Sequence, residues 1–166
     1  HLRTRRQRQM CIRDSVSVVL PLHNAATTLH ETLSSIQSQT LQNIEIVMID
    51  DFSTDETRPI AESICYKDSR FRFIRAQSRG LVPALNQGIE AAISPLIARM
   101  DGDDIMLPSR LEKQVALLAK EPSVGIASCG VASFSDGEIG EGYRLYDAWL
   151  NGLVSHEAIY LSLIHI

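Results

Sequence analysis

The chain has 166 residues, enough for one domain with a hydrophobic core of its own. Leu, Ile, Val and Phe account for 48 of them, well above the roughly one-fifth share below which chains tend to stay disordered, so general disorder is excluded. The formal net charge is −4, and polar residues interrupt every apolar run before it reaches the ~18 residues of a membrane span.

The two ends differ in composition from the middle. Five of the 16 basic residues, all of them arginines, fall within the first 13 positions. The run at 6–15 resembles translated sequencing-adapter read-through, and so does the run at 161–166. We therefore expect residues 1–15 to be a non-native or disordered basic arm, residues 161–166 to be an artefactual tail, and natural sequence to cover about 16–160.

Strand-like and helix-like segments alternate between these ends. Apolar, β-branched runs predict strands at 16–20, 44–49, 71–74 and 96–100. Apolar residues at helical spacing predict helices at about 26–38, around Ile60 and Ile64, and through Leu81, Leu85, Ile89 and Ile93. Since a helix separates each strand from the next, we expect an α/β fold with a doubly wound parallel sheet, right-handed crossovers and helices on both faces.

Three further signals complete the secondary-structure prediction. A helix begins near Pro108, because proline suits the first turn of a helix. A short strand follows at about 124–128, and another helix at about 143–156. Before the second predicted helix, Ser53 and Glu56 stand three residues apart, which predicts a capping box in which each side chain binds the other's backbone N–H.

Acidic residues follow two of the predicted strands directly. They are Asp50 and Asp51 after the second strand, and the run Asp101-Gly102-Asp103-Asp104 after the fourth. Ligands of open parallel sheets bind at this edge, where the strands end. Neighbouring carboxylates repel one another by about 1 kcal/mol at ~4 Å in water and more when partly buried, so a cation is expected beside the run. Oxygen ligands without His or Cys favour Mg²⁺ or Mn²⁺, and such ions imply a nucleotide or diphosphate ligand.

Other signatures of nucleotide and metal chemistry are missing from the sequence. It has neither the Gly-x-x-x-x-Gly-Lys-Ser/Thr motif of a P-loop nor the Gly-x-Gly-x-x-Gly motif of a dinucleotide-binding fold. Its three cysteines form no Cys-x-x-Cys pair, which favours a reducing compartment and no zinc or redox site. Two arginines could contact phosphate: Arg79, beside Gly80, is a candidate for a mobile diphosphate contact, and Arg99 directly precedes the acidic run.

An ordered series of motifs resembles the family 2 glycosyltransferases of the GT-A fold. The motifs are Val16-Ser17-Val18-Val19-Leu20-Pro21-x-x-Asn24, Ser35-Ile36-x-x-Gln39-Thr40, Asn43-Ile44-Glu45-Ile46-Val47, Asp50-Asp51-x-Ser53-Thr54-Asp55 and Met100-Asp101-Gly102-Asp103-Asp104. The resemblance covers about 16–158, and the order and spacing of the motifs make it specific. It implies a Rossmann-like nucleotide-diphospho-sugar transferase fold with a mostly parallel sheet, truncated on its C-terminal side.

The resemblance also implies a role for individual residues in binding a nucleotide-sugar donor. Pro21 and Asn24 would line the pocket for the base, and Asp51, supported by Asp50, would accept a hydrogen bond from it. The Asp-x-Asp element of the family corresponds to Asp101 and Asp103. In the family pattern Asp103 contacts ribose or metal, and Asp104 coordinates the metal directly.

The activity implied is inverting, metal-dependent transfer of a sugar to a glycan or lipid-linked acceptor. Partners would then be the nucleotide-sugar and the acceptor, with no nucleic acid, and the protein would be cytoplasmic, with peripheral association at the inner face of the membrane. The family's general base lies downstream of the metal motif, so we expect it beyond these residues. Alternatives are a non-catalytic nucleotide-sugar-binding fragment and, with less support, a nucleotidyltransferase, which usually needs a phosphate loop near the first strand.

Overall fold

A computed structural model describes residues 15–135, 137–155 and 157–158. The tail expected at 161–166 and all but the last residue of the basic arm expected at 1–15 therefore lie outside the described residues. The chain divides into two compact units, His1–Gly125 and Ile126–Ile166, and each is described by itself.

The first unit is built on a sheet of four parallel strands, as the alternation of strands and helices predicts. The strands are β1 (Val16–Leu22), β2 (Ile44–Asp50), β3 (Phe71–Arg75) and β4 (Leu96–Arg99). Their order across the sheet is β3-β2-β1-β4, so the chain crosses from one side of β1 to the other after β3. Leu22, Asp50 and Arg75 align in the register, which brings the carboxyl ends of three strands to one edge.

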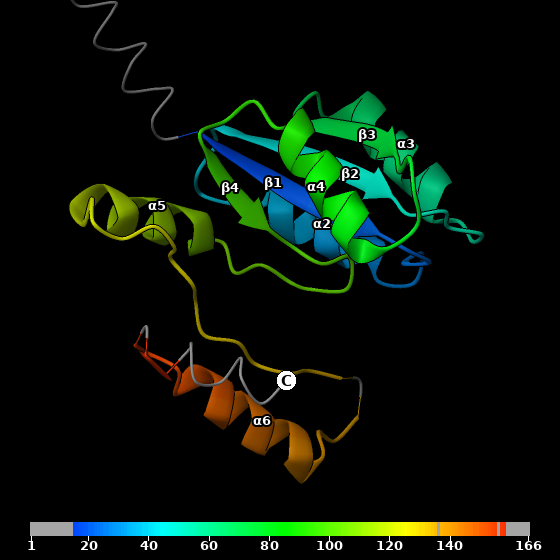
Figure 1. The fold of residues 1–166 in the computed structure, drawn as a ribbon. Coiled ribbons are helices and arrows are strands. Elements are labelled where there is room, and N and C mark those ends of the chain that lie inside the picture. The colour runs from blue at the N-terminus through cyan, green and yellow to red at the C-terminus, as the bar shows by residue number, and fades with distance from the viewer. Residues whose placement is uncertain (1–14, 136, 156, 159–166) are drawn as a thin grey trace, which may run out of the picture. The chain divides into compact units, whose positions relative to one another are not determined.

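Four helices accompany the sheet: α2 (Leu29–Gln37), α3 (Thr57–Lys67), α4 (Leu81–Ala91) and α5 (Arg110–Lys120). In Figure 1, α4 lies in front of the sheet and α2 behind it. The two faces have separate apolar clusters, because alternate residues of a strand point to opposite faces. Val18 and Leu20 of β1 pack with Leu29 and Leu33 of α2, whereas Val19 packs with Ala84 of α4.

The residues of helix α4 that are fully buried against the sheet are small ones. Leu81 and Ile89, which predicted the helix by their spacing, are 48% and 49% exposed, while Ala84 and Gly88 are buried. A Cβ atom at position 88 would lie 2.5 Å from Val19 Cγ1. The helix therefore lies so close to the sheet that Leu81 and Ile89 are left at its sides, while Leu85 packs partly buried against the apolar cluster of this face.

Two local predictions are wrong. No strand forms at 124–128; this stretch is irregular, with Ile126 86% exposed, and the described residues offer no neighbouring strand to complete its backbone hydrogen bonds. The capping box is also absent, because the hydroxyl of Ser53 accepts the backbone N–H of Asn24 instead. Where α3 begins, the N–H of Thr57 donates to the carboxylate of Asp55.

The second unit contains the last predicted helix, α6 (Glu141–Asn151). Its Asn151 side chain donates to the carbonyl of Val131 and accepts the N–H of the same residue, both at 2.8 Å. Asp147 likewise accepts the backbone N–H and the hydroxyl of Ser133. Nowhere in 15–135, 137–155 and 157–158 is there a helix long and apolar enough to cross a membrane.

Candidate functional site

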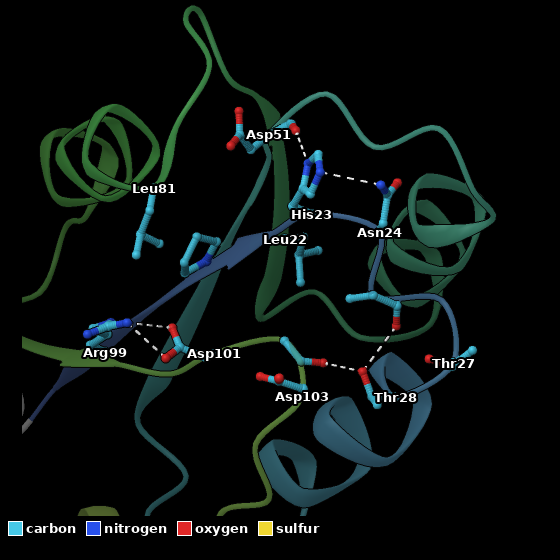
Figure 2. A pocket seen from close by; sticks show the side chains of 13 residues that line it. Leu22, His23, Asn24, Thr27, Thr28, Asp51, Leu81, Arg99, Asp101 and Asp103 are labelled. Atoms are coloured by element: carbon cyan, nitrogen blue, oxygen red, sulfur yellow. Dashed lines mark hydrogen bonds and ion pairs between the residues drawn. The ribbon is translucent and has the colours of Figure 1, made fainter.

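A pocket of about 400 Å³ lies at the edge where β1, β2 and β4 end (Figure 2). It is lined by Pro21, Leu22, His23, Asn24, Ala25, Thr27, Thr28, Asp51, Leu81, Arg99, Asp101, Gly102 and Asp103. In Figure 2, Asp51 and His23 lie above the end of β1, and Arg99, Asp101 and Asp103 lie below it. The pocket therefore joins the two acidic motifs, which are about 50 residues apart in the chain.

Five of the seven residues predicted to bind substrate line this pocket: Pro21, Asn24, Asp51, Asp101 and Asp103. Asp50 does not, since it is 3% exposed and borders a second cavity of about 240 Å³ together with Phe52, Arg75 and Ala76. One oxygen of Asp50 accepts the backbone N–H of Ser53 at 3.2 Å. Asp50 thus fixes the turn that carries Asp51.

Asp51 connects three elements at the upper end of the pocket. Its backbone N–H donates to the carbonyl of Leu22 at 2.8 Å, which continues the pairing of β1 with β2. Both carboxylate oxygens accept the backbone N–H of Gly80, each at 3.0 Å, just before α4 begins. A carboxylate has about four acceptor positions, so Asp51 retains acceptor capacity toward the pocket.

His23 and Asn24 join the loop after β1 to the loop after β2. Nδ1 of His23 lies 2.6 Å from the carbonyl of Asp51, and because a carbonyl only accepts, Nδ1 carries the proton. Nε2 of the neutral ring is then the acceptor for the Asn24 amide at 3.3 Å. Asn24 has a φ of 50°, a left-handed conformation, and its side-chain oxygen accepts the N–H of Thr54 at 2.8 Å.

Arg79 lies outside the pocket lining and against an aromatic ring. Its guanidinium carbon is 5.1 Å from the centroid of Phe52, a cation–π contact. Phe52 has a φ of 55°, which is rare for a side chain of this size and places the ring at the surface, 40% exposed. The contact predicted between Arg79 and a diphosphate would require this side chain to leave the ring.

The acidic run after β4 contains one ion pair, between Asp101 and Arg99, and two further carboxylates, those of Asp103 and Asp104. Nη2 of Arg99 donates to both carboxylate oxygens of Asp101, at 3.0 and 2.8 Å. The pKa of Asp104 is raised, first because its carboxyl is partly buried and second because Asp101 and Asp103 place negative charge beside it. Arg99 and Arg110 offset part of this negative charge, and a cation beside the run would offset more of it.

These carboxylates fit a divalent ion that also binds its substrate. Within the part of the chain that the structure describes, no group of three or more His, Cys, Asp or Glu side chains could hold a metal by itself. Mg²⁺ and Mn²⁺ favour carboxylate oxygens, and Mg²⁺ typically takes one or two carboxylates and completes its coordination with water and substrate phosphates. Asp103, which lines the pocket, and its neighbour Asp104, which does not, supply donors of that kind, and they fit such an ion with a diphosphate completing its coordination.

Sequence patterns did not point to several of the lining residues. Thr28 and Leu81 enter the pocket because α2 and α4 begin at this edge of the sheet. A threonine before a helix is typical of helix starts in general and carries no signal for a ligand. Only the topology, which brings both helix starts to the same strand ends, identifies them.

A comparison with protein families matches the model described as "Glycosyl transferase family 2" over residues 17–160. The chain belongs to this family. Among curated relatives, it is 39% identical over 124 residues to "Putative glycosyltransferase EpsE" of Bacillus subtilis, covering 73% of this chain and 44% of that protein. An "Uncharacterized glycosyltransferase" of Haemophilus influenzae is 35% identical over 146 residues, covering 86% of this chain and 45% of that protein. The chain thus spans less than half the length of these relatives.

Solved structures of this fold are similar to the chain. The mannosyltransferase PcManGT of Pyrobaculum calidifontis, solved in complex with GDP-Man and Mn²⁺, matches with a TM-score of 0.57 and 27% identity, covering 63% of this chain and 32% of that one. The S. aureus protein TarS, solved with UDP, matches with a TM-score of 0.60 and 24% identity, over 65% and 33% of the two chains. The family member therefore has the predicted GT-A fold.

Proposed function

We propose that the pocket between Asp51 and the Asp101–Asp104 run binds a nucleotide-sugar, as the donor site of a glycosyltransferase. The single observation that carries the proposal is the meeting of Pro21, Asn24, Asp51, Asp101 and Asp103 in one pocket. Residues 16–160 then form the donor-binding portion of the enzyme.

The base of the nucleotide occupies the end of the pocket near Asp51 in this proposal. The carboxylate of Asp51 accepts a hydrogen bond from the base, and Asp50 supports it by fixing the turn at Ser53. Pro21 and Asn24 form the wall at the end of β1. The bond from Gly80 orients the Asp51 carboxylate before the nucleotide arrives, which lowers the cost of ordering on binding.

The diphosphate lies toward the acidic run, where Asp103 and Asp104 hold Mg²⁺ or Mn²⁺. When bound, such an ion stabilises the negative charge of the departing nucleoside diphosphate as the sugar leaves. Asp101 stays paired with Arg99, so that the local charge is partly balanced. The complex of PcManGT with GDP-Man and Mn²⁺ supports a donor and metal of this class. Arg79 contacts the diphosphate after leaving Phe52.

Transfer itself is inverting in this proposal, with attack by a hydroxyl of a glycan or lipid-linked acceptor. The general base must lie within hydrogen-bond reach of that hydroxyl, and we assign it to none of the described residues. An acceptor anchored in lipid would bring the enzyme to the inner face of the cytoplasmic membrane.

Calorimetric titration with UDP and with GDP, each with and without Mn²⁺, tests the donor site. We expect one nucleoside diphosphate to bind, with an affinity that rises when Mn²⁺ is present. Asp103→Asn should remove that rise, whereas Glu62→Gln, on the exposed surface of α3, should leave it unchanged. Metal-dependent binding that persists in an Asp103→Asn, Asp104→Asn double variant would contradict the proposed site.

A further inference from the structure

Helix α2 and the residues flanking it carry a row of buried and half-buried polar side chains beside the apolar face. Thr28, Thr32, Ser35 and Gln39 follow one another at intervals of four, three and four residues, so they share one side of the helix. Thr32 and Gln39 are each 1% exposed. We call these four residues the polar stripe. A buried polar group needs a hydrogen-bond partner, and besides carbonyls of its own neighbourhood each member of the polar stripe has a partner in the segment from Gly102 to Leu111.

The first partner is the carbonyl of Gly102, inside the Asp-x-Asp element. The hydroxyls of Thr28 and Thr32 donate to this oxygen at 2.9 and 3.0 Å. Figure 2 shows the bond from Thr28. Two donors use both lone pairs of the carbonyl, so the plane of the peptide bond between Gly102 and Asp103 is fixed. The orientation of Asp103 at its backbone follows from that plane.

Close packing holds the same peptide from the other side. A Cβ atom at position 102 would lie 3.0 Å from Leu22 Cδ2 and 3.2 Å from Ala25 Cβ. Gly102 is buried although Asp103 beside it is exposed. A side chain at this position would therefore press on Leu22 and Ala25, which also line the pocket.

The rest of the polar stripe holds the chain beyond the acidic run. Ser35 Oγ accepts the backbone N–H of Met106 at 3.0 Å. Gln39 donates to the carbonyl of Leu107 at 2.9 Å, and its side-chain oxygen accepts the N–H of Leu111 at 3.3 Å. The backbone from Gly102 to the start of α5 is therefore bonded to α2 along its length, although it contains no regular structure before α5.

From these contacts we propose that Thr32, assisted by Thr28, is a positioning residue for the metal and diphosphate end of the pocket. Carboxylates that repel one another would move apart if their backbone were free, and the bonds to Gly102 O prevent this at Asp103. Thr32 is the principal donor, because the Thr28 hydroxyl also lies 3.3 Å from the carbonyl of Ala25 and has a single proton to share. The inference rests on the proposed function.

Thr32→Val removes the hydroxyl with little change of shape, and Thr32→Ser keeps it. Ser17→Ala is a matched control, because the Ser17 hydroxyl is also fully buried but lies early in β1, where it accepts the N–H of Ser94 and donates to Glu45. For each protein the quantity measured is the ratio of UDP (or GDP) affinity with Mn²⁺ to that without it, together with the melting temperature.

We expect Thr32→Val to lower this ratio by about 10-fold, the usual effect of losing a group that orients a metal ligand. Thr32→Ser should restore the ratio, and Ser17→Ala should lower the melting temperature without changing the ratio. Should Thr32→Val fold poorly, Thr28→Val should lower the ratio in the same direction by a smaller factor.

Two results would overturn the inference, and they are distinguishable. If Thr32→Val and Ser17→Ala both lower the melting temperature while leaving the ratio unchanged, the polar stripe acts on stability only. If the unaltered protein binds neither UDP nor GDP more tightly with Mn²⁺, the proposed function itself fails and the inference falls with it.

Discussion

The carboxylate of Asp51 accepts the backbone N–H of Gly80 with both oxygens, at 3.0 Å each. This contact ties the end of β2 to the start of α4 beside the pocket. The φ of Gly80 is 113°, a conformation that favours glycine, so the residue that donates to Asp51 is constrained as well. Asp51 therefore has a structural role, through Gly80, and a proposed role in binding the base of a nucleotide. A substitution at Asp51 can separate these two roles.

Asp51→Asn should weaken nucleotide binding while keeping the fold. Asparagine retains one oxygen for the Gly80 N–H, so the free energy of unfolding should fall by no more than about 1 kcal/mol. Loss of the charged acceptor for the base should weaken UDP or GDP binding by about 10-fold or more. Calorimetry and thermal melting measure the two effects. An Asp51→Asn protein that binds nucleotide as tightly as the unaltered protein would remove Asp51 from the base site.

Removing the metal should cancel the stabilisation that a nucleotide gives. A ligand that binds only the folded state stabilises it by about 2.7 kcal/mol at 100 times its dissociation constant. We therefore expect UDP or GDP with Mn²⁺ to raise the melting temperature, and EDTA to remove most of that increase. EDTA alone, without nucleotide, should leave the melting temperature unchanged, because the described side chains cannot hold the ion by themselves.

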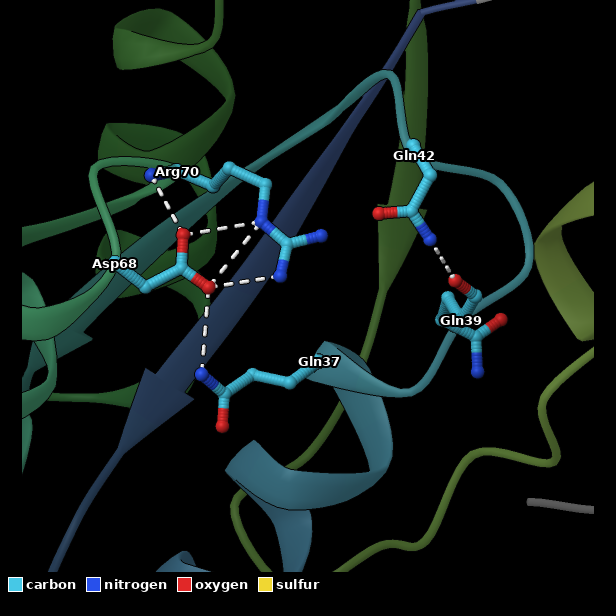
Figure 3. Close-up of polar contacts among 5 residues, drawn as sticks. All are labelled: Gln37, Gln39, Gln42, Asp68 and Arg70. Atoms are coloured by element: carbon cyan, nitrogen blue, oxygen red, sulfur yellow. Dashed lines mark hydrogen bonds and ion pairs between the residues drawn. The ribbon is translucent and has the colours of Figure 1, made fainter.

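The ion pair of Asp68 and Arg70 should stabilise the fold except in strong acid (Figure 3). Hydrogen bonds from the Arg70 guanidinium lower the pKa of Asp68 from 3.8 to about 2. Since the folded-state pKa is the lower one, the stabilisation is present above the unfolded value and is lost as the pH falls through about 2. Asp68→Asn should cost about 1–2 kcal/mol at neutral pH, because the pair is only partly exposed.

Urea unfolding at several pH values measures that difference. The stability that the unaltered protein has over Asp68→Asn should shrink as the pH falls from about 5 to about 2. Glu62→Gln, which breaks an exposed pair with Arg58, is the control and should change stability by less than about 0.5 kcal/mol at any pH. A difference for Asp68→Asn that grows as the pH falls would contradict this assignment.

Gly88→Ala should destabilise the first unit by about 1–3 kcal/mol through overpacking. The added Cβ would lie 2.5 Å from Val19 Cγ1 and 2.6 Å from Ile49 Cδ1, so α4 or these two side chains must shift. Gly142→Ala is the matched control in α6, where the new Cβ would meet nothing within 4 Å. This second substitution should be neutral or favourable by up to about 1 kcal/mol, because alanine is the better helix former. Equal effects of the two would show that the close approach of α4 is absent in solution.

The sheet and the placement of the acidic motifs were predictable because they depend on local patterns. Each of the four strands is a short segment rich in apolar residues, and parallel strands must end at one edge, which brings Asp51 and Asp101 together. The packing of α4 was not predictable in this way. Periodic leucines and isoleucines indicate a helix, but the distance between helix and sheet is set by Gly88 and Ala84, which have no such periodic signal.

The polar stripe shows a second limit of sequence patterns. Thr32 and Gln39 bond to Gly102 and Leu107, whose positions in the chain are some 70 residues away. These partners are backbone atoms, so no side-chain type at 102 or 107 signals the contact. The irregular stretch at 124–128 illustrates the converse, since an apolar run becomes a strand only when a neighbouring strand accepts its backbone hydrogen bonds.

The central claim is tested most directly by locating Mn²⁺ in a crystal structure. The crystals are grown with Mn²⁺ and with whichever nucleotide, UDP or GDP, binds more tightly. Anomalous scattering identifies the ion without ambiguity. We predict a single strong peak between the carboxylates of Asp103 and Asp104 and the diphosphate, with the base beside Asp51. A nucleotide bound away from the ends of β1 and β4, or an ion with no contact to Asp103 or Asp104, would contradict the account.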